Sequence, residues 1–463
     1  MKKFLFSVLL LAVFAAAGCK SVDSMSKAEA HVAEAQYDDA VALLEQLEET
    51  SYYKEKNRLL YCLDYGILCH YAGKWDESNK YLHEAEFLAE ELYTKSLSRE
   101  IGSYLINDRV KEYAGEDYEK IYIHIFKCLN FIALGDNDGA MVEIRKANLR
   151  MQLLEDRYRK EVSEFNSSGE SEYSIAPVKN HFHNSALSRY LGTLLYRQDG
   201  AADDARIESE WLERAFLEQK KVYGFQMPQI PETGKSRNRT LLDVVAFSGL
   251  GPVKESLDFT VTASGGLVTF SVSGLNDDAV KDLLTFNVLP IGNFKGINVI
   301  RFEVPVLKER SSAPDRVVVR LDDGMGSVRE LELLENMNSI SDDIYKRRLP
   351  FTVLKTALRV VGKKAGSEAG ESAITESSGN STLGILSGLV FDIVAAATER
   401  ADLRGCYFLP AFASVGEFSV EPGIYDITVE YYKGESLVKA DIHRDFSVER
   451  GRLNLLESYN FGE

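Results

Sequence analysis

The spacing of apolar residues along the chain changes near residue 257. Before this point, apolar and small residues recur every three or four positions; after it, they alternate with polar residues. The first period is typical of amphipathic helices and the second of half-buried strands. We therefore expect an α+β multidomain protein with a helical half at residues 19–225, a linker and junction loop at 226–256, and a strand-rich half at 257–463.

The helical half repeats one arrangement of helix, short turn and second helix. Small residues recur in matched places, at Gly66, Gly73 and Ala85 in one copy and at Gly135 and Ala147 in the next. A partial copy precedes these two, and a decayed copy follows at residues 189–216. The pattern resembles tetratricopeptide repeats, in which small residues let paired helices approach closely and a glycine ends the first helix. It predicts a tetratricopeptide-like α-solenoid, irregular because most consensus Trp and Pro positions are missing.

A helical stack of this kind has an exposed concave face, and its usual function is to bind a partner there. The alternative is that the helices pack against the strand-rich half and carry no ligand. We favour binding.

Four segments of the second half show strand periodicity or turn signals between strands. They lie at residues 257–273, 297–306, 316–333 and 420–448. Together they predict a β-sandwich-like domain. A helical hairpin is expected to interrupt it at about residues 338–400. Its first helix is basic, so contact with anionic lipid is an alternative to packing on the sandwich, which we favour because Asp392 interrupts the second helix.

The chain begins with two lysines and an uncharged stretch from Phe4 to Gly18, which is too short to span a bilayer. The stretch ends Ala16-Ala17-Gly18-Cys19, which resembles a bacterial lipobox. The resemblance implies a lipoprotein signal peptide at residues 1–18, cleavage before Cys19, and acylation of this cysteine. Ordinary secretion with a chance cysteine is the alternative.

Composition excludes some partners. The formal net charge of −17 argues against nucleic acid and anionic lipid as general partners. Four cysteines follow Cys19, at positions 62, 69, 128 and 406. Cys62 and Cys69 would lie about 10.5 Å apart along one helix, which is too far for a disulfide. We expect all four to be small buried residues.

Several short motifs resemble chemical sites without meeting their requirements. The stretch at 135–143 has Leu134 where a calcium loop needs its first oxygen ligand, so Asp136 is expected to cap a helix. His181 and His183 have no cysteine or carboxylate at metal-ligand spacing. Ser436 and Lys439 lie within a predicted strand rather than on a helix. We expect no metal, no cofactor and no enzymatic activity, although paired carboxylates in the strand-rich half would leave no local signature.

The stretch "FSGLGPVKES" is too rich in glycine to be an ordinary core strand. Gly249 and Gly251 permit backbone conformations closed to other residues, and Pro252 removes a donor. We expect a loop between the two halves, near "YFLPAF". Lys254 either contacts a ligand at this junction or belongs to a loop that only sets the angle between the halves.

Several segments together resemble a family of bacterial lipoproteins that contain tetratricopeptide repeats. They are the lipobox, "YEKIYIHIFKCLNFIALGDNDGAMVEIRKAN", "FSGLGPVKES" and "ADLRGCYFLPAFASVGEFSVEPGIYDITVEY". The resemblance implies a cell-envelope protein, and Lys20 favours an outer membrane facing the periplasm. We expect a protein-protein interaction scaffold whose partners are envelope proteins. An envelope hydrolase that uses carboxylates in the strand-rich half is the alternative.

Overall fold

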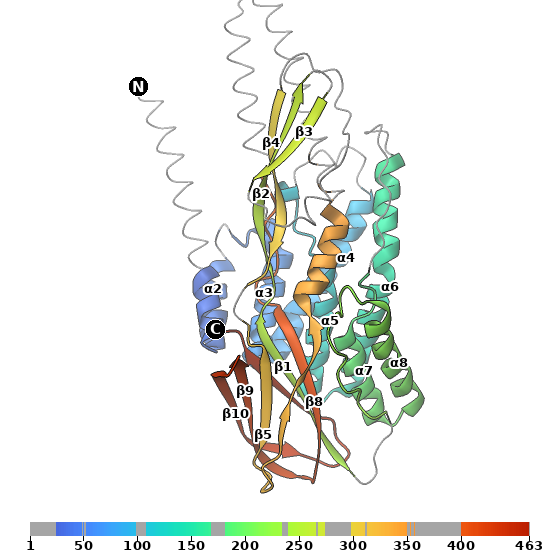
Figure 1. The fold of residues 1–463 in the computed structure, drawn as a ribbon, viewed down its shortest axis with the longest axis vertical. Helices are drawn as coiled ribbons and strands as arrows, with labels where there is room; N and C mark the ends of the chain where they lie inside the picture. Colours follow the sequence, from blue (N-terminus) through green and yellow to red (C-terminus); the bar gives the residue numbers. More distant parts are fainter. Residues whose placement is uncertain are drawn as a thin grey trace, which may run out of the picture.

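A computed structural model describes most of the chain. The described residues are 25–48, 50, 52–98, 108–167, 181–233, 239–264, 267–273, 298–310, 313–349, 352, 356 and 400–462. Helices come first and strands follow, so the α+β class is confirmed (Figure 1). The predicted signal peptide, Cys19 and the second helix of the predicted insertion lie outside the described residues.

The helices follow one another as packed pairs. After a helical segment at 25–33 come α2 (Tyr37–Glu48), η1 (Glu55–Asn57), α3 (Arg58–Tyr71), α4 (Trp75–Ser98), η3 (Asp108–Val110), α5 (Asp117–Ala133), α6 (Asn137–Ser167), α7 (Ala186–Asp199) and α8 (Ala202–Glu218). Helices α3 and α4, α5 and α6, and α7 and α8 form the three closest pairs.

The small residues predicted from the repeats have the expected physical role. A Cβ atom added to Gly66 would lie 2.9 Å from two side-chain carbons of Leu82, so the absence of a side chain lets α3 and α4 approach. Gly73, Gly135 and Gly200 end the first helix of each pair with positive φ angles of 71°, 77° and 82°. Only glycine adopts this conformation without strain.

The strands form three sheets. Their bounds are β1 (Thr240–Leu250), β2 (Val253–Ser264), β3 (Leu267–Ser273), β4 (Asn298–Lys308), β5 (Arg316–Leu321), β6 (Val328–Glu330), β7 (Glu332–Asn336), β8 (Pro410–Val420), β9 (Gly423–Lys433), β10 (Ser436–Val448) and β11 (Asn454–Asn460). The first sheet has the order β11-β1-β8-β7, the second β10-β9-β5-β6, and the third β3-β2-β4. The third sheet projects from the body of the molecule (Figure 1).

Strand β1 lies at the centre of a layered core. Its residues Val245 and Phe247 belong to the apolar cluster that contains the helices, whereas Val244 and Ala246 belong to the cluster shared with β5 and β9. Successive side chains of a strand point to opposite faces. The first sheet therefore lies between the helices on one side and the second sheet on the other.

The predicted linker at 226–256 is wrong in its second part. Strand β1 begins at Thr240 and β2 at Val253, so only Gly251 and Pro252 form the turn between them. Because β1 is buried on both faces, it has no alternation of apolar and polar residues to reveal it. The unusual backbone at Gly249, with φ of 61°, and the proximity to "YFLPAF" are confirmed, since Gly251 donates to the Leu409 carbonyl at 2.7 Å.

Other local predictions hold. The hairpins β2–β3, β5–β6 and β9–β10 pair as antiparallel strands. Residues 337–349 are helical, in agreement with the first helix of the predicted insertion. Asp136 caps α6 by accepting from the Gly139 amide at 2.9 Å. Among the described helices, none combines the length and the apolarity that a membrane span requires.

Candidate functional site

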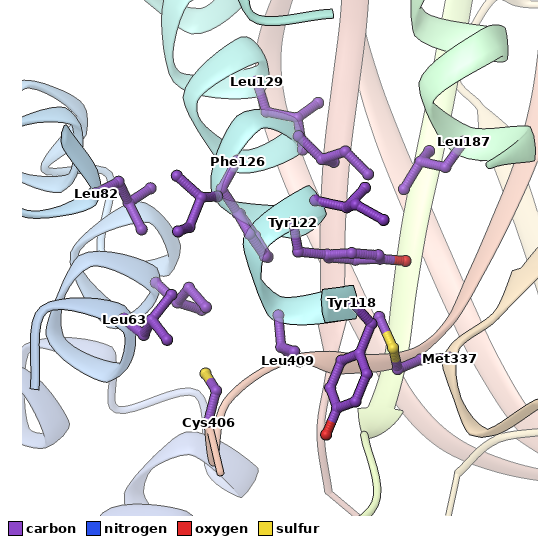
Figure 2. Packing of buried hydrophobic residues seen from close by; sticks show 14 of the residues in the cluster. Leu63, Leu82, Tyr118, Tyr122, Phe126, Leu129, Leu187, Met337, Cys406 and Leu409 are labelled. Atoms are coloured by element: carbon purple, nitrogen blue, oxygen red, sulfur yellow. The ribbon is translucent and has the colours of Figure 1, made fainter. Parts of the chain in front are cut away.

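The most elaborate polar site joins the helices to the strand-rich half. A segment that we call the junction segment, Asp402–Leu409, precedes β8 and runs across α3 and α5 (Figure 2). The Cys406 and Leu409 side chains lie beside Leu63 of α3 and Tyr118 of α5 in this view. Cys406, Phe408 and Leu409 are buried.

Two buried carboxylates hold the backbone of the junction segment. The Cys406 amide donates to Oε1 of Glu119 on α5 at 2.7 Å, and the next amide, of Tyr407, donates to Oδ1 of Asp64 on α3 at 2.8 Å. The Tyr71 hydroxyl donates to the Phe408 carbonyl at 2.8 Å. The helices therefore recognise the main chain of an extended peptide, and this peptide belongs to the same molecule.

The two carboxylates have little water around them. Burial raises the pKa of Asp64 to about 7, although the Tyr407 amide and the Tyr53 hydroxyl oppose this shift. Burial, and then the neighbouring Glu116, also raise the pKa of Glu119. Carboxyl groups with raised pKa values are typical of catalytic sites. Here, however, both accept hydrogen bonds from buried donors of the protein, so a structural role explains them.

Lys254 lies at the edge of the same site. Its ammonium group forms an ion pair with Glu116, the residue before α5, and donates to the Arg404 carbonyl at 2.8 Å. Burial lowers the pKa of Lys254, but the nearby carboxylates of Glu116 and Asp402 outweigh it, and the net pKa is raised. The side chain is only 6% exposed. These contacts favour the interpretation in which Lys254, which lies in β2 rather than in a loop, fixes the angle between the halves.

A third buried carboxylate fastens β7 to the start of α7. Glu335 accepts from the Ser185 hydroxyl at 2.8 Å, from the Leu187 amide at 3.0 Å, and from the hydroxyls of Tyr122 and Tyr223, both at 2.9 Å. Burial raises its pKa despite these donors. The first amides of a helix lack intrahelical partners, and this carboxylate satisfies one of them.

One group of side chains has metal-ligand chemistry. Ligand atoms of Glu86, His124 and Glu143 all lie within 4.8 Å of one another between α4, α5 and α6. The Lys127 ammonium, however, lies 2.7 Å from Glu86 and 3.0 Å from Glu143. This lysine occupies the place of a cation, so the group is explained as a buried ion-pair network.

Two pockets lined by described residues are small. One of about 190 Å³ is lined by residues that include Glu449, Arg452 and Glu457, and one of about 50 Å³ by residues that include Arg197 and Asp243. Pockets that hold small molecules usually measure about 300–1,000 Å³. Both pockets are below this range.

The outward-facing helices expose apolar side chains. On α6, Val142, Leu149 and Leu153 are 46%, 55% and 37% exposed. Their spacing of seven and four residues places them on one face of the helix. We call these three residues the α6 stripe.

Sequence analysis found Lys254 but missed Asp64, Glu119 and Glu335. The run RLLYCLDYGILCHY around Asp64 is apolar on nearly all sides, which is typical of a buried helix, so Asp64 could have been found from this signal. Glu119 and Glu335 lie among 71 Asp and Glu residues and were not distinguished from the others. The four cysteines at 62, 69, 128 and 406 are free and buried, as predicted.

The rings of His181 and His183 have different partners. The His181 ring contacts Asp343 at 2.8 Å, and the His183 ring nitrogen Nδ1 lies 3.1 Å from the His181 carbonyl. Ser436 and Lys439 lie in β10, a strand as expected. Comparison with known proteins gives no match among family models, curated proteins or solved structures.

Proposed function

We propose that the protein is a lipid-anchored cell-envelope protein that acts as a protein-protein interaction scaffold. The anchor is the predicted acylated Cys19, and the proposed location is an outer membrane with the protein facing the periplasm. The partner is another envelope protein. The observation that carries the proposal is the α6 stripe, because three large apolar side chains on one exposed helical face are typical of an interaction site.

The architecture supports this proposal. Successive helix pairs with glycine-terminated first helices are consistent with a tetratricopeptide-like stack, and two sheets with a shared apolar cluster are consistent with a β-sandwich. The inner face of the stack contacts the first sheet and the junction segment. A partner would therefore use the outer helices α4, α6 and α8.

Photo-crosslinking in cells tests the scaffold and its surface together. A photoreactive amino acid replaces Leu149 in one strain and Ile442 in another; the two side chains are 55% and 54% exposed, which makes Ile442 of β10 a matched control. We expect one envelope protein to be captured from position 149 and none from position 442. Capture from neither position would contradict the scaffold, and capture from position 442 alone would contradict the surface.

A second test separates loss of contact from loss of fold. Leu149→Glu places a charge in the α6 stripe at an exposed position, where substitutions usually change stability by less than about 0.5 kcal/mol. We expect the partner to be lost while thermal stability stays unchanged. Ile442→Glu should change neither.

The rival function, an envelope hydrolase, has little support. The larger of the two described pockets encloses about 190 Å³, although Glu449 and Glu457 both line it. Cell-wall hydrolysis by the purified chain that is lost in Glu449→Gln and Glu457→Gln variants would overturn our preference.

A further inference from the structure

One exposed region of this acidic protein is basic. Two turns that are far apart in the sequence meet there: the Lys56 ammonium donates to the Arg109 carbonyl at 3.0 Å, and the Tyr113 amide donates to the Lys56 carbonyl at 2.7 Å. We call Lys54, Lys56, Arg109, Lys111, Val110 and Leu403 the basic face. Its four cations outnumber the three acids of the same two turns, Glu55, Asp108 and Glu112.

The cations are close enough to affect one another. Burial, and then the nearby guanidinium groups of Arg404 and Arg109, lower the pKa of Lys56, and the carboxylate of Asp402 only partly opposes this shift. Crowded positive charge of this kind is unexpected in a chain with net charge −17, and it favours contact with an anionic surface.

Two apolar side chains accompany the charges. Val110 is 68% exposed and Leu403 is 43% exposed. Leu403 belongs to the junction segment, and the next residue, Arg404, donates to the Lys111 carbonyl at 3.0 Å. Basic and apolar side chains on one surface are the combination that binds a membrane interface.

The basic face lies beside the start of the described chain. The hydroxyl of Tyr53, the residue before Lys54, lies 3.7 Å from the Met25 sulfur. Five residues lie between Cys19 and Met25, and the six Cα–Cα steps of an extended chain reach about 20 Å. A lipid on Cys19 would therefore hold this part of the molecule close to the bilayer.

The basic face and helix α2 both lie near the N-terminal segment, and their charges differ in sign. The charged residues of the neighbouring helix α2 are Asp38, Asp39, Glu45 and Glu48, all acidic. An anionic bilayer repels them and attracts the basic face. The net charge still opposes free association, but an anchored chain needs only to choose its orientation.

We propose that the basic face rests on an anionic lipid surface when the chain is anchored at its N-terminus. This inference rests on the proposed lipid anchor and adds an orientation and a ligand class to it. Each exposed lysine near an anionic surface contributes about fivefold to binding. Loss of Lys54 and Lys56 should therefore lower the ratio of docked to undocked protein roughly 25-fold.

Fluorescence quenching by lipid measures this orientation. The acylated chain carries a thiol-reactive fluorophore on Val110→Cys or, as the control, on Met325→Cys in the exposed turn between β5 and β6; the buried native cysteines should not react. Vesicles contain quencher-labelled lipid in phosphatidylglycerol or in phosphatidylcholine. We expect strong quenching at position 110 and weak quenching at 325. The strong quenching at position 110 should disappear on phosphatidylcholine vesicles. It should also disappear in 1 M salt, which shortens the screening length to about 3 Å.

Matched variants identify the cause. Lys54→Ala with Lys56→Ala should abolish quenching at position 110, whereas Lys220→Ala with Lys221→Ala, another pair of exposed lysines, should leave it unchanged. Equal quenching at positions 110 and 325, or quenching that survives loss of Lys54 and Lys56, would overturn the proposal.

A different way of attaching the chain to the vesicle tests the basic face independently of the proposed lipid anchor. The chain from Lys20 onward carries an N-terminal hexahistidine bound to nickel-chelating lipid, and the same fluorophore positions are measured. If the native chain does not float with vesicles, the lipid anchor is wrong, but this tethered form still reports the orientation. No excess quenching at position 110 in the tethered form contradicts the basic face.

Discussion

Replacing Lys254 by methionine removes a buried charge at the junction and keeps most of the apolar stem. The Lys254 side chain is 6% exposed and that of Glu116 is 20% exposed. Removing one member of a buried ion pair costs about 3–5 kcal/mol, because the other charge is left without a partner. Because the Glu116 carboxylate is partly exposed and regains some water, we expect a loss of unfolding free energy at the lower end of this range, about 3 kcal/mol.

The assay is thermal or urea unfolding of the full chain. The entropy of unfolding is about 2.1 cal/mol/K per residue, or about 0.9 kcal/mol/K for a chain of this length that unfolds as one unit. A loss of 3 kcal/mol then lowers the melting temperature by about 3 °C. Adding Glu116→Gln to Lys254→Met removes the unpaired charge and should restore at least about 1 kcal/mol of the lost unfolding free energy. Substitutions of two residues in contact do not have additive effects on stability.

Lys308→Met is the matched control. Lys308 also forms an ion pair with a glutamate, Glu255, at 2.6 Å, but the two side chains are 61% and 51% exposed. An exposed pair contributes about 0–1 kcal/mol. If Lys254→Met were no more harmful than Lys308→Met, the structural role of Lys254 would be refuted. Loss of the partner captured at Leu149 with stability intact would instead assign Lys254 to ligand contact.

Three further predictions follow from the packing and the buried acids. Gly66→Ala should destabilise the chain by about 1–3 kcal/mol in urea unfolding, because the new methyl group overlaps the buried Leu82 side chain; unchanged stability would show that α3 and α4 can separate. Asp64 has a folded pKa of about 7 against an ordinary value of about 3.9, so the folded state holds a proton that the unfolded chain releases. The contribution of Asp64 to the free energy of unfolding is present near pH 4 and lost as pH rises to 7. In urea unfolding at a series of pH values, Asp64→Asn should therefore make the free energy of unfolding fall less between pH 4 and 7 than it does in the wild type. Residues 19–225 alone should bind a hydrophobic dye and unfold without cooperativity, because their inner face loses its cover; a sharp transition would show that the helical half is an independent domain.

The sequence predicted features that depend on neighbouring residues. Gly66, Gly73 and Gly135 were recognised from their spacing, because close approach and positive φ restrict those positions to small residues or glycine. The hairpins were recognised because one face of each strand is more polar than the other. Strand β1 was missed for the opposite reason: both of its faces are buried, so its apolar run has no period of two.

Contacts between distant segments could not be predicted in the same way. Lys254 and Glu116 are 138 residues apart, and Glu119 and Cys406 are 287 residues apart. The apolar run around Asp64 predicts a buried helix but not the amide that its carboxyl group accepts from. Gly251 and Pro252 predicted a turn between the halves, and the partners at that contact came only from the structure.

The closed inner face determines where a partner can bind. Displacing the junction segment would expose Phe408 and Leu409, each worth about 1.5–3 kcal/mol of burial. It would also break two hydrogen bonds from amides to the carboxyl groups of Asp64 and Glu119, each worth about 0.5–1.5 kcal/mol when the acceptor is uncharged, the form that the raised pKa values of both groups favour. The sum of about 4–9 kcal/mol is a large part of the stability of a domain. A competing peptide would have to supply this free energy before it gained any affinity. The inner face of the stack is therefore closed by this internal contact, and the proposed partner has to bind the outer helices.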